Sequence, residues 1–321
     1  MKILAITATL LAAILLHGCA GTSMSGADVP AHEAPSRTVA MQCGTLPVTF
    51  HERDGRAQLE TPEGSYSLER IASPAAARYQ AVEHPDTEFR ISGDRAQLTL
   101  GGETLPECLV PGRVAQPFSA RGNEPFWRLD LDGDTLHLDR LGHDALSGRF
   151  GWDETTADVS RGSAMLADEG LVLRVRHEIC HDSMTGMPHP RDVTLAWQGE
   201  EYSGCGGDPV RLLRGRAWVV DAMAGQQAVA TAPPTLMFLA EGRVAGRAAC
   251  NRYRATYELT GEGLTIDRPA VTRMACAAEV MEQEDRFLDH LAAVERFRIA
   301  GDGSLELVGA GETLVRLRHD R

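Results

Sequence analysis

The sequence has almost no lysine. Lys2 is the only one, so nearly every basic side chain of the 321-residue chain is an arginine, and the formal net charge is −13. Aromatic residues make up only 5% of the chain. Nucleic-acid binding needs a basic face that neutralises phosphates. The acidic balance therefore argues against a nucleic-acid partner and favours a strongly cationic one.

Several catalytic motifs are also missing. The sequence has no G-x-S-x-G elbow, no P-loop and no dinucleotide-binding glycine motif. No motif of these kinds therefore indicates a site for nucleophilic catalysis or for nucleotide binding. We therefore predict a non-enzymatic protein with no catalytic residues, no metal and no cofactor. Apart from residues 3–16, no segment is long and apolar enough to suggest a membrane span, and even this run is shorter than the roughly 20 residues that a spanning helix needs.

The N-terminus resembles a bacterial lipoprotein signal. An apolar run from Ile3 to Leu16 is followed by His17, Gly18 and Cys19, which predicts a signal peptide over residues 1–18 and lipidation of Cys19. The alternative is an ordinary cleaved signal that leaves Cys19 as a free thiol. Because Ala20, not Asp, follows the cysteine, the resemblance favours the outer membrane, with the lipid-anchored protein facing the periplasm.

The cysteines divide the rest of the chain. Seven cysteines less a lipidated Cys19 leave six, and in an oxidising compartment an even number predicts three disulfides. Proline and glycine punctuation suggests a flexible tether at 19–41 and modules at 42–112, 115–213 and 214–321. One disulfide per module is the simplest pairing, which gives Cys43–Cys108, Cys180–Cys205 and Cys250–Cys276.

Short alternating segments predict a mainly β protein. Apolar residues alternate around the turn dipeptides Asp54-Gly55, Gly93-Asp94, Gly101-Gly102 and Asp132-Gly133, which is typical of hairpins. The single long helical pattern covers residues 277–297. We therefore expect three small, disulfide-closed β-rich modules in tandem, of which the third is α+β with one helix.

Residues 177–181, His-Glu-Ile-Cys-His, match the H-E-x-x-H signature of zinc metalloproteases. A zinc site needs both histidines on one helical turn. Residues 171–180 alternate as in a strand, where residues four apart lie about 13 Å from each other and cannot share an ion. Cys180 is also needed for a disulfide, so a zinc hydrolase is only a remote alternative.

Residues 42–110 resemble the membrane-bound inhibitors of c-type lysozyme (the MliC family), which are small β-barrels on lipid tethers. The resemblance rests on Cys43-Gly44, on the segment from Ser65 to Tyr79 and on Cys108. It implies a β-barrel first module, a cationic c-type lysozyme as partner, and lysozyme contacts at Tyr79, Phe89 and Gly93. The inhibitory motifs of the family are only partly present, because four positions depart from them: Ala75, Ala76, Arg90 and Ser92.

Residues 115–213 resemble an uncharacterised bacterial lipoprotein domain. The matching motifs are Glu124–Trp127, C-x-D-x-M-[ST]-G over residues 180–186, and Gly204–Gly207. The resemblance implies a Cys180–Cys205 disulfide but no activity. From the residues alone, an aromatic core beside a disulfide corner explains these clusters.

Residues 216–318 are similar to the META domain of the heat-shock lipoprotein HslJ. The matching features are Trp218, Cys250-Asn251 with Tyr257, the segment Thr272–Cys276, and Glu284 in the predicted helix. The resemblance implies a role in heat and antibiotic resistance without catalytic residues. Together the modules predict an envelope lipoprotein for stress or host-defence resistance. The alternative is a periplasmic binding or chaperone-like protein without lysozyme inhibition, and the oligomeric state stays open.

Overall fold

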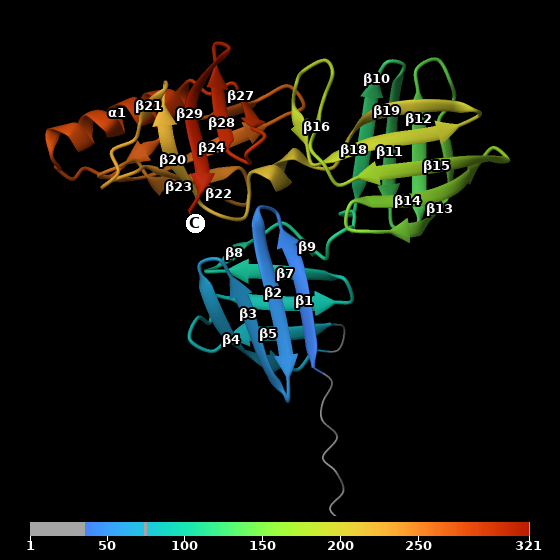
Figure 1. Ribbon diagram of the computed structural model, residues 1–321, viewed down its shortest axis with the longest axis horizontal. Helices are drawn as coiled ribbons and strands as arrows, with labels where there is room; N and C mark the ends of the chain where they lie inside the picture. The colour runs from blue at the N-terminus through green and yellow to red at the C-terminus, as the bar shows by residue number, and fades with distance from the viewer. Residues whose placement is uncertain (1–35, 74–75, 321) are drawn as a thin grey trace, which may run out of the picture. The chain divides into compact units, whose positions relative to one another are not determined.

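A computed structural model describes residues 36–73 and 76–320 (Figure 1). The predicted signal peptide, Cys19 and Ala75 lie outside these residues. Among the described residues, helix α1 is too short and too polar to cross a membrane, and no other segment forms a helix that could.

The first module is a ring of antiparallel strands: β1 Arg37–Cys43, β2 Leu46–Arg53, β3 Arg56–Thr61, β4 Gly64–Ile71, β5 Ala77–Ala81, β6 Glu88–Ser92, β7 Arg95–Leu100, β8 Glu103–Thr104 and β9 Cys108–Leu109. Successive strands pair from β1 to β7, and β9 closes the ring by pairing with both β7 and β1. The predicted barrel is confirmed. However, β1 begins inside the predicted tether, because Met41 and Cys43 alternate inward with the pattern of a strand.

The second module is a closed barrel: β10 Phe118–Asn123, β11 Phe126–Asp132, β12 Thr135–Arg140, β13 Leu146–Thr155, β14 Val159–Leu166, β15 Glu169–Arg176, β18 Arg191–Trp197 and β19 Glu200–Gly206. Two short strands, β16 Cys180–His181 and β17 Pro188–His189, form a separate hairpin between β15 and β18. Leucines that alternate along β11, β12 and β15 fill the core.

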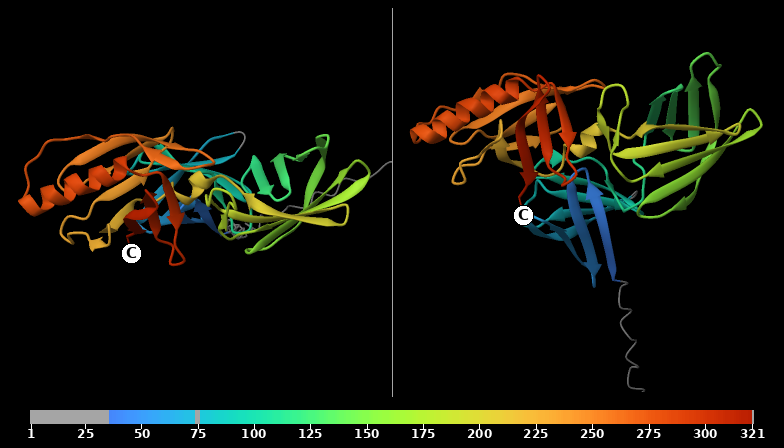
Figure 2. Two further views of the ribbon diagram at one scale, coloured as in Figure 1. Left: turned by 90° about the horizontal axis from the view of Figure 1, so that it is seen from above. Right: turned by 45° about the horizontal axis from the view of Figure 1, so that its top comes forward.

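The 3₁₀ helix η1 Pro209–Leu212 lies at the end of the second module, and the third module contains one α-helix. Its elements are β20 Trp218–Met223, β21 Gln226–Gln227, β22 Thr235–Phe238, β23 Arg243–Arg247, β24 Arg252–Leu259, β25 Leu264–Ile266, β26 Ala270–Val271, α1 Ala278–Ala292, β27 Arg296–Ile299, β28 Leu305–Gly309 and β29 Glu312–His319. Helix α1 lies beside the strands (Figure 2) and buries Phe287 and Leu291. It ends five residues before the predicted end, because Arg296 and Phe297 pair with β28.

Each module contains one disulfide: Cys43–Cys108, Cys180–Cys205 and Cys250–Cys276. The four predicted hairpin turns are present as well. At one of them, Asp54 and Gly55 both have positive φ, at 52° and 74°, the conformation for which Asp-Gly is favoured.

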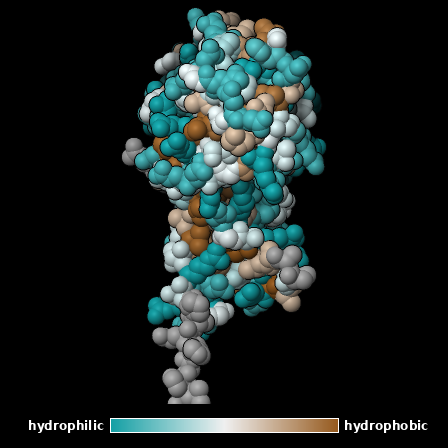
Figure 3. All heavy atoms as spheres, turned by 90° about the vertical axis from the view of Figure 1, so that its right-hand side faces the viewer, coloured by the Kyte–Doolittle hydropathy of each residue, from teal (hydrophilic) through white to brown (hydrophobic). Residues whose placement is uncertain are grey.

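The described residues form one compact unit. Met187, from the loop between β16 and β17, belongs to the hydrophobic core of the third module. The Thr45 amide donates to the Arg214 carbonyl at 2.8 Å, which joins the first module to the start of the third. On the face that Figure 3 shows, hydrophilic residues predominate and hydrophobic ones form small, separate groups.

Candidate functional site

The candidate site is built around Asp182, in the loop between β16 and β17. Oδ1 of its carboxylate accepts the amides of Met184 and Thr185, each at 2.9 Å, and the Thr185 hydroxyl at 3.2 Å. An aspartate side chain that accepts backbone amides two or three residues ahead stabilises a tight turn. The side chain therefore fixes the shape of the loop that carries it.

Gly186 completes this turn. It has φ +71°, and its amide donates to the Asp182 carbonyl at 2.8 Å. Glycine adopts this conformation without the steric cost that other residues meet. The motif C-x-D-x-M-[ST]-G therefore has a structural reason: Cys180 anchors the loop, Asp182 and Thr185 close it, and Gly186 turns the chain.

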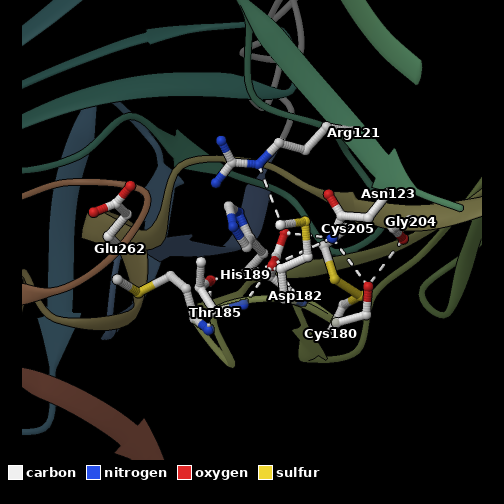
Figure 4. Close-up of polar contacts among 12 residues, drawn as sticks. Arg121, Asn123, Cys180, Asp182, Thr185, His189, Gly204, Cys205 and Glu262 are labelled. Atoms are coloured by element: carbon white, nitrogen blue, oxygen red, sulfur yellow. Dashed lines mark hydrogen bonds and ion pairs between the residues drawn. A yellow bond between two sulfur atoms is a disulfide. The ribbon is translucent and has the colours of Figure 1, made fainter. Parts of the chain in front are cut away.

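Asn123 and Arg121, on β10, approach the same carboxylate from the barrel. Asn123 Nδ2 lies 3.3 Å from each oxygen of Asp182 and 3.0 Å from Ser183 Oγ. Arg121 Nε lies 3.8 Å from Asp182 Oδ2. Figure 4 shows these side chains and the Cys180–Cys205 disulfide gathered around the loop. The cluster thus ties the loop to the rim of the barrel.

The glycine motif at 204–207 lets the barrel close beside this cluster. Strands β10 and β19 pair here, with Arg121 opposite Cys205. A β-carbon at Gly204 would lie 2.1 Å from the Arg121 carbonyl oxygen and 2.8 Å from the Trp127 ring. Only glycine fits such an approach. The predicted disulfide corner is present, and Trp127 is in the core, but Phe126 points outward and is 46% exposed.

Two opposing effects set the pKa of Asp182. Burial alone would raise it, since a charged carboxylate loses hydration. The amides of Thr185 and Met184, with the side chains of Asn123 and Thr185, favour the charged form more strongly, so the pKa is lowered overall. Asp182 is therefore a carboxylate at neutral pH although it is only 7% exposed.

A cavity of about 320 Å³ opens beside this cluster, within the size range of small-molecule sites. Its polar lining includes Asn123, His181, Asp182, Ser183 and Ser203. These groups can hold a polar ligand through hydrogen bonds. A cleft of this kind, with its side chains fixed by a disulfide and a closed turn, is suited to recognition.

The H-E-x-x-H segment begins in the bend after β15 and ends in β16. β15 ends at Arg176, which shortens the predicted strand by four residues, and Cys180 lies in β16. His177 Nε2 lies 3.0 Å from the hydroxyl of the fully buried Ser160, and Cys180 is in its disulfide. Within residues 36–73 and 76–320, no three His, Cys, Asp or Glu side chains are arranged to hold a metal ion.

The three residues that the lysozyme-inhibitor resemblance assigned to contacts are not on one surface. Tyr79 is 1% exposed and Phe89 is 0% exposed; both pack against Phe50 inside the first barrel. The Tyr79 hydroxyl donates to Glu52 at 2.8 Å. The contact role predicted for these two is wrong in this fold, because both point inward from their strands. Gly93 alone lies at an open turn.

The third module contains a second buried carboxylate. Glu284, on α1, accepts the amides of Cys250 and Asn251 at 3.1 and 2.7 Å and the Asn251 side-chain amide at 2.7 Å. Asn251 Oδ1 in turn accepts the Thr272 hydroxyl and the Met274 amide. This explains why Cys250-Asn251, Thr272–Cys276 and Glu284 occur together: they form one hydrogen-bonded unit beside the Cys250–Cys276 disulfide.

Sequence reasoning missed Arg121, and it assigned no role to Asp182. The motif C-x-D-x-M-[ST]-G was a signal for the aspartate. Arg121 stands in no motif, and only the pairing of β10 with β19 brings it to the loop.

Fold and site together define a class: a modular, β-rich protein with one disulfide per module and a polar cleft in the second. Residues 211–321 match the family model of the META domain, so the third module is a META domain, as predicted. This domain supports a stress-related role in the cell envelope in general.

No curated protein matches the chain. One solved structure, an NMR structure of a protein from Burkholderia xenovorans, is 25% identical over 34% of this chain and 85% of its own, with a TM-score of 0.29.

Proposed function

We propose that this protein is a lipid-anchored envelope protein, held in the outer membrane through Cys19, that acts in stress or host-defence resistance by binding and not by catalysis. The META domain supports the stress role. The three disulfides fit an oxidising compartment such as the periplasm. The lipobox-like sequence before Cys19 supports the anchor.

The observation that carries the binding role is the fixed polar cleft beside Asp182. Its carboxylate is satisfied by the loop, while Asn123, Ser183 and Ser203 line an open cavity. Two serine–histidine pairs are hydrogen-bonded among the residues described, Ser160 with His177 and Ser147 with His137, and neither pair lines the cleft. The Ser160 hydroxyl is also fully buried and donates to the Gly112 carbonyl. The cleft therefore offers recognition groups without an activated nucleophile beside them.

A complementation experiment tests this proposal. In a strain that lacks the protein, we expect the wild-type gene to restore heat and antibiotic tolerance, and a Cys19→Ala or Asn123→Ala variant to restore it only in part. Immunoblots of membrane fractions control for protein level and location. Full restoration by Asn123→Ala at normal protein level would contradict a role of the cleft, and full restoration by Cys19→Ala would contradict the anchor.

Inhibition of a cationic c-type lysozyme is a second candidate. It is supported by the disulfide-closed barrel of the first module and by the net charge of −13, since opposite charge speeds association. The purified protein is mixed at micromolar concentration with lysozyme, and lysis of peptidoglycan is followed by turbidity. Protection supports this activity, and unimpeded lysis excludes it.

A further inference from the structure

A second cavity, of about 480 Å³, shares Arg121 and Cys205 with the cleft beside Asp182. Its lining includes Ser119, Arg121, Arg128, His189, Gly207 and Gly261. In Figure 4 the guanidinium of Arg121 and the ring of His189 lie on the same side of Asp182, away from the disulfide. This cavity, here called the Arg121 pocket, has the size of a small-molecule site.

The Nη1 and Nη2 groups of Arg121 are available as hydrogen-bond donors in this pocket. Its Nε is held near Asp182 Oδ2, at 3.8 Å, which directs one edge of the guanidinium toward the loop. The Nη1 and Nη2 atoms lie against Gly261, where an added β-carbon would be 3.2 and 2.9 Å from them. Glycine thus leaves room for the guanidinium fork. Neither Nη atom makes a hydrogen bond within the part of the chain that the structure describes, and such a fork fits a carboxylate.

His189 supplies an acceptor. The side chain is 6% exposed, and Nδ1 lies 3.0 Å from the Gly207 carbonyl oxygen. A carbonyl only accepts, so Nδ1 carries the proton and Nε2 has a free lone pair. Nε2 is buried and has no hydrogen-bond partner. Burial, and then the charge of Arg121, lowers the pKa of His189, which keeps the ring neutral at pH 7.

The other charged groups around the pocket are already engaged or exposed. Arg128 makes two hydrogen bonds to Asp130, at 2.8 and 3.1 Å. Asp208 accepts the Val210 amide at the start of η1. Glu262 is exposed beside Gly261. Arg121 and His189 are therefore the groups of this pocket that a ligand can satisfy.

We propose that the Arg121 pocket binds a small organic carboxylate that also carries an O–H or N–H group. The carboxylate pairs with Nη1 and Nη2 of Arg121, and the O–H or N–H donates to Nε2 of His189. A sugar acid of the cell wall and a free hydroxy acid both carry this combination of groups. The choice of a cell-wall sugar as a probe rests on the proposed periplasmic function. The predicted pairing of a carboxylate with Arg121 and of an O–H or N–H group with His189 does not depend on that function.

Isothermal titration calorimetry of the full-length protein, purified as a Cys19→Ala variant, tests the proposal. N-acetylmuramic acid, N-acetylglucosamine and lactate serve as probes. The first two share a ring, hydroxyls and an acetamido group, but only N-acetylmuramic acid has a carboxylate. We expect it to bind at least tenfold more tightly than N-acetylglucosamine. Tighter binding of lactate than of N-acetylmuramic acid would assign the pocket to free hydroxy acids instead of sugar acids.

Two variants locate the binding. Arg121→Gln should weaken carboxylate binding at least tenfold, whereas Arg128→Gln, in the same pocket but paired with Asp130, should change it less than twofold. A thermal melt confirms that each variant is folded. Equal affinity for the two sugars, no binding of any probe at millimolar concentration, or unchanged binding by Arg121→Gln would each overturn the proposal. These results come from purified protein, so they are independent of the complementation experiment.

Discussion

The second and third modules each bury a carboxylate beside a disulfide, but the two carboxylates are held differently. Asp182 lies next to Cys180–Cys205, and Glu284 next to Cys250–Cys276. Both accept two backbone amides, and both accept the side-chain amide of an asparagine, Asn123 or Asn251. The chemistry is therefore the same in both places.

The difference lies in the asparagines. Asn251 is fully buried, and both ends of its side-chain amide are hydrogen-bonded. Asn123 is half-buried, its hydrogen bonds are 3.0 to 3.3 Å long, and it lines a cavity. A saturated, closed network specifies a fold, whereas one with an open side leaves polar groups for a ligand. The comparison teaches that the Glu284 network is structural and that the Asp182 network borders a site.

The largest effect should come from Glu284→Ala. It leaves the amides of Cys250 and Asn251 and the Asn251 side chain without their acceptor, and each unsatisfied buried group costs about 1–3 kcal/mol. We expect the third module to lose at least about 3 kcal/mol of stability, measured by hydrogen exchange of residues 218–319. Glu282→Ala, exposed on the same helix, is the control, with a change within about 0.5 kcal/mol. Equal effects of the two variants would show that the network is not structural.

Asp182→Ala should cost less, about 1–3 kcal/mol, because the loop can admit water to the freed amides. The exchange of the Met184 and Thr185 amides should rise most, since they lose their acceptor. The pKa of Asp182 is lowered in the folded protein, so its stabilisation is present above the unfolded value of about 3.9 and is lost as the pH falls below it. The Asp182→Ala variant should show a smaller acid-induced loss than the wild type. A larger destabilisation than that of Glu284→Ala would reverse the comparison.

His177 makes the second module sensitive to weaker acid. Burial, and then the charge of Arg191, lowers its pKa to about 4. Between about pH 6.5 and pH 4, His177 therefore binds a proton in the unfolded chain but not in the folded protein. The free energy of unfolding is unaffected by His177 above pH 6.5 and decreases as the pH falls toward 4. Because the ring is only half-buried, we expect a loss of about 1–2 kcal/mol. Urea unfolding at pH 7, 5.5 and 4.5 measures this loss. If a His177→Gln variant loses as much stability between pH 7 and pH 4.5 as the wild type, His177 is not its cause.

The sequence was sufficient for the features that depend on local pattern. Alternation predicted a strand at Leu171, Leu173 and Val175, all three of which lie on one buried face of β15, and Asp-Gly or Gly-Gly pairs located the turns. The cysteine pairing also follows from the sequence, because each pair lies within one module. These features are short-range, or are confined to one module by its length.

The features that depend on tertiary closure were not predictable. A resemblance to a loop motif does not say which way Tyr79 points, and only the register of β5 places its ring inside the barrel. Arg121 reaches Asp182, 61 positions later in the chain, because β10 pairs with β19 and a disulfide joins β19 to the loop. Such a convergence is set by long-range pairing, which the local sequence does not record.

The smallest effect should come from Asn123→Ala, and it bears on the comparison most directly. Its hydrogen bonds to Asp182 are long, at 3.3 Å, and the backbone amides of Met184 and Thr185 still hold the carboxylate. We expect a loss within about 1 kcal/mol, whereas Asn251→Ala, which breaks a closed buried network, should lose about 2–4 kcal/mol. Urea unfolding of both variants measures the contrast. If Asn123→Ala is as destabilising as Asn251→Ala, the Asp182 network stabilises the fold as the Glu284 network does. If Asn123→Ala is nearly neutral, Asn123 is not needed for stability and can bind a ligand in the cleft that it lines.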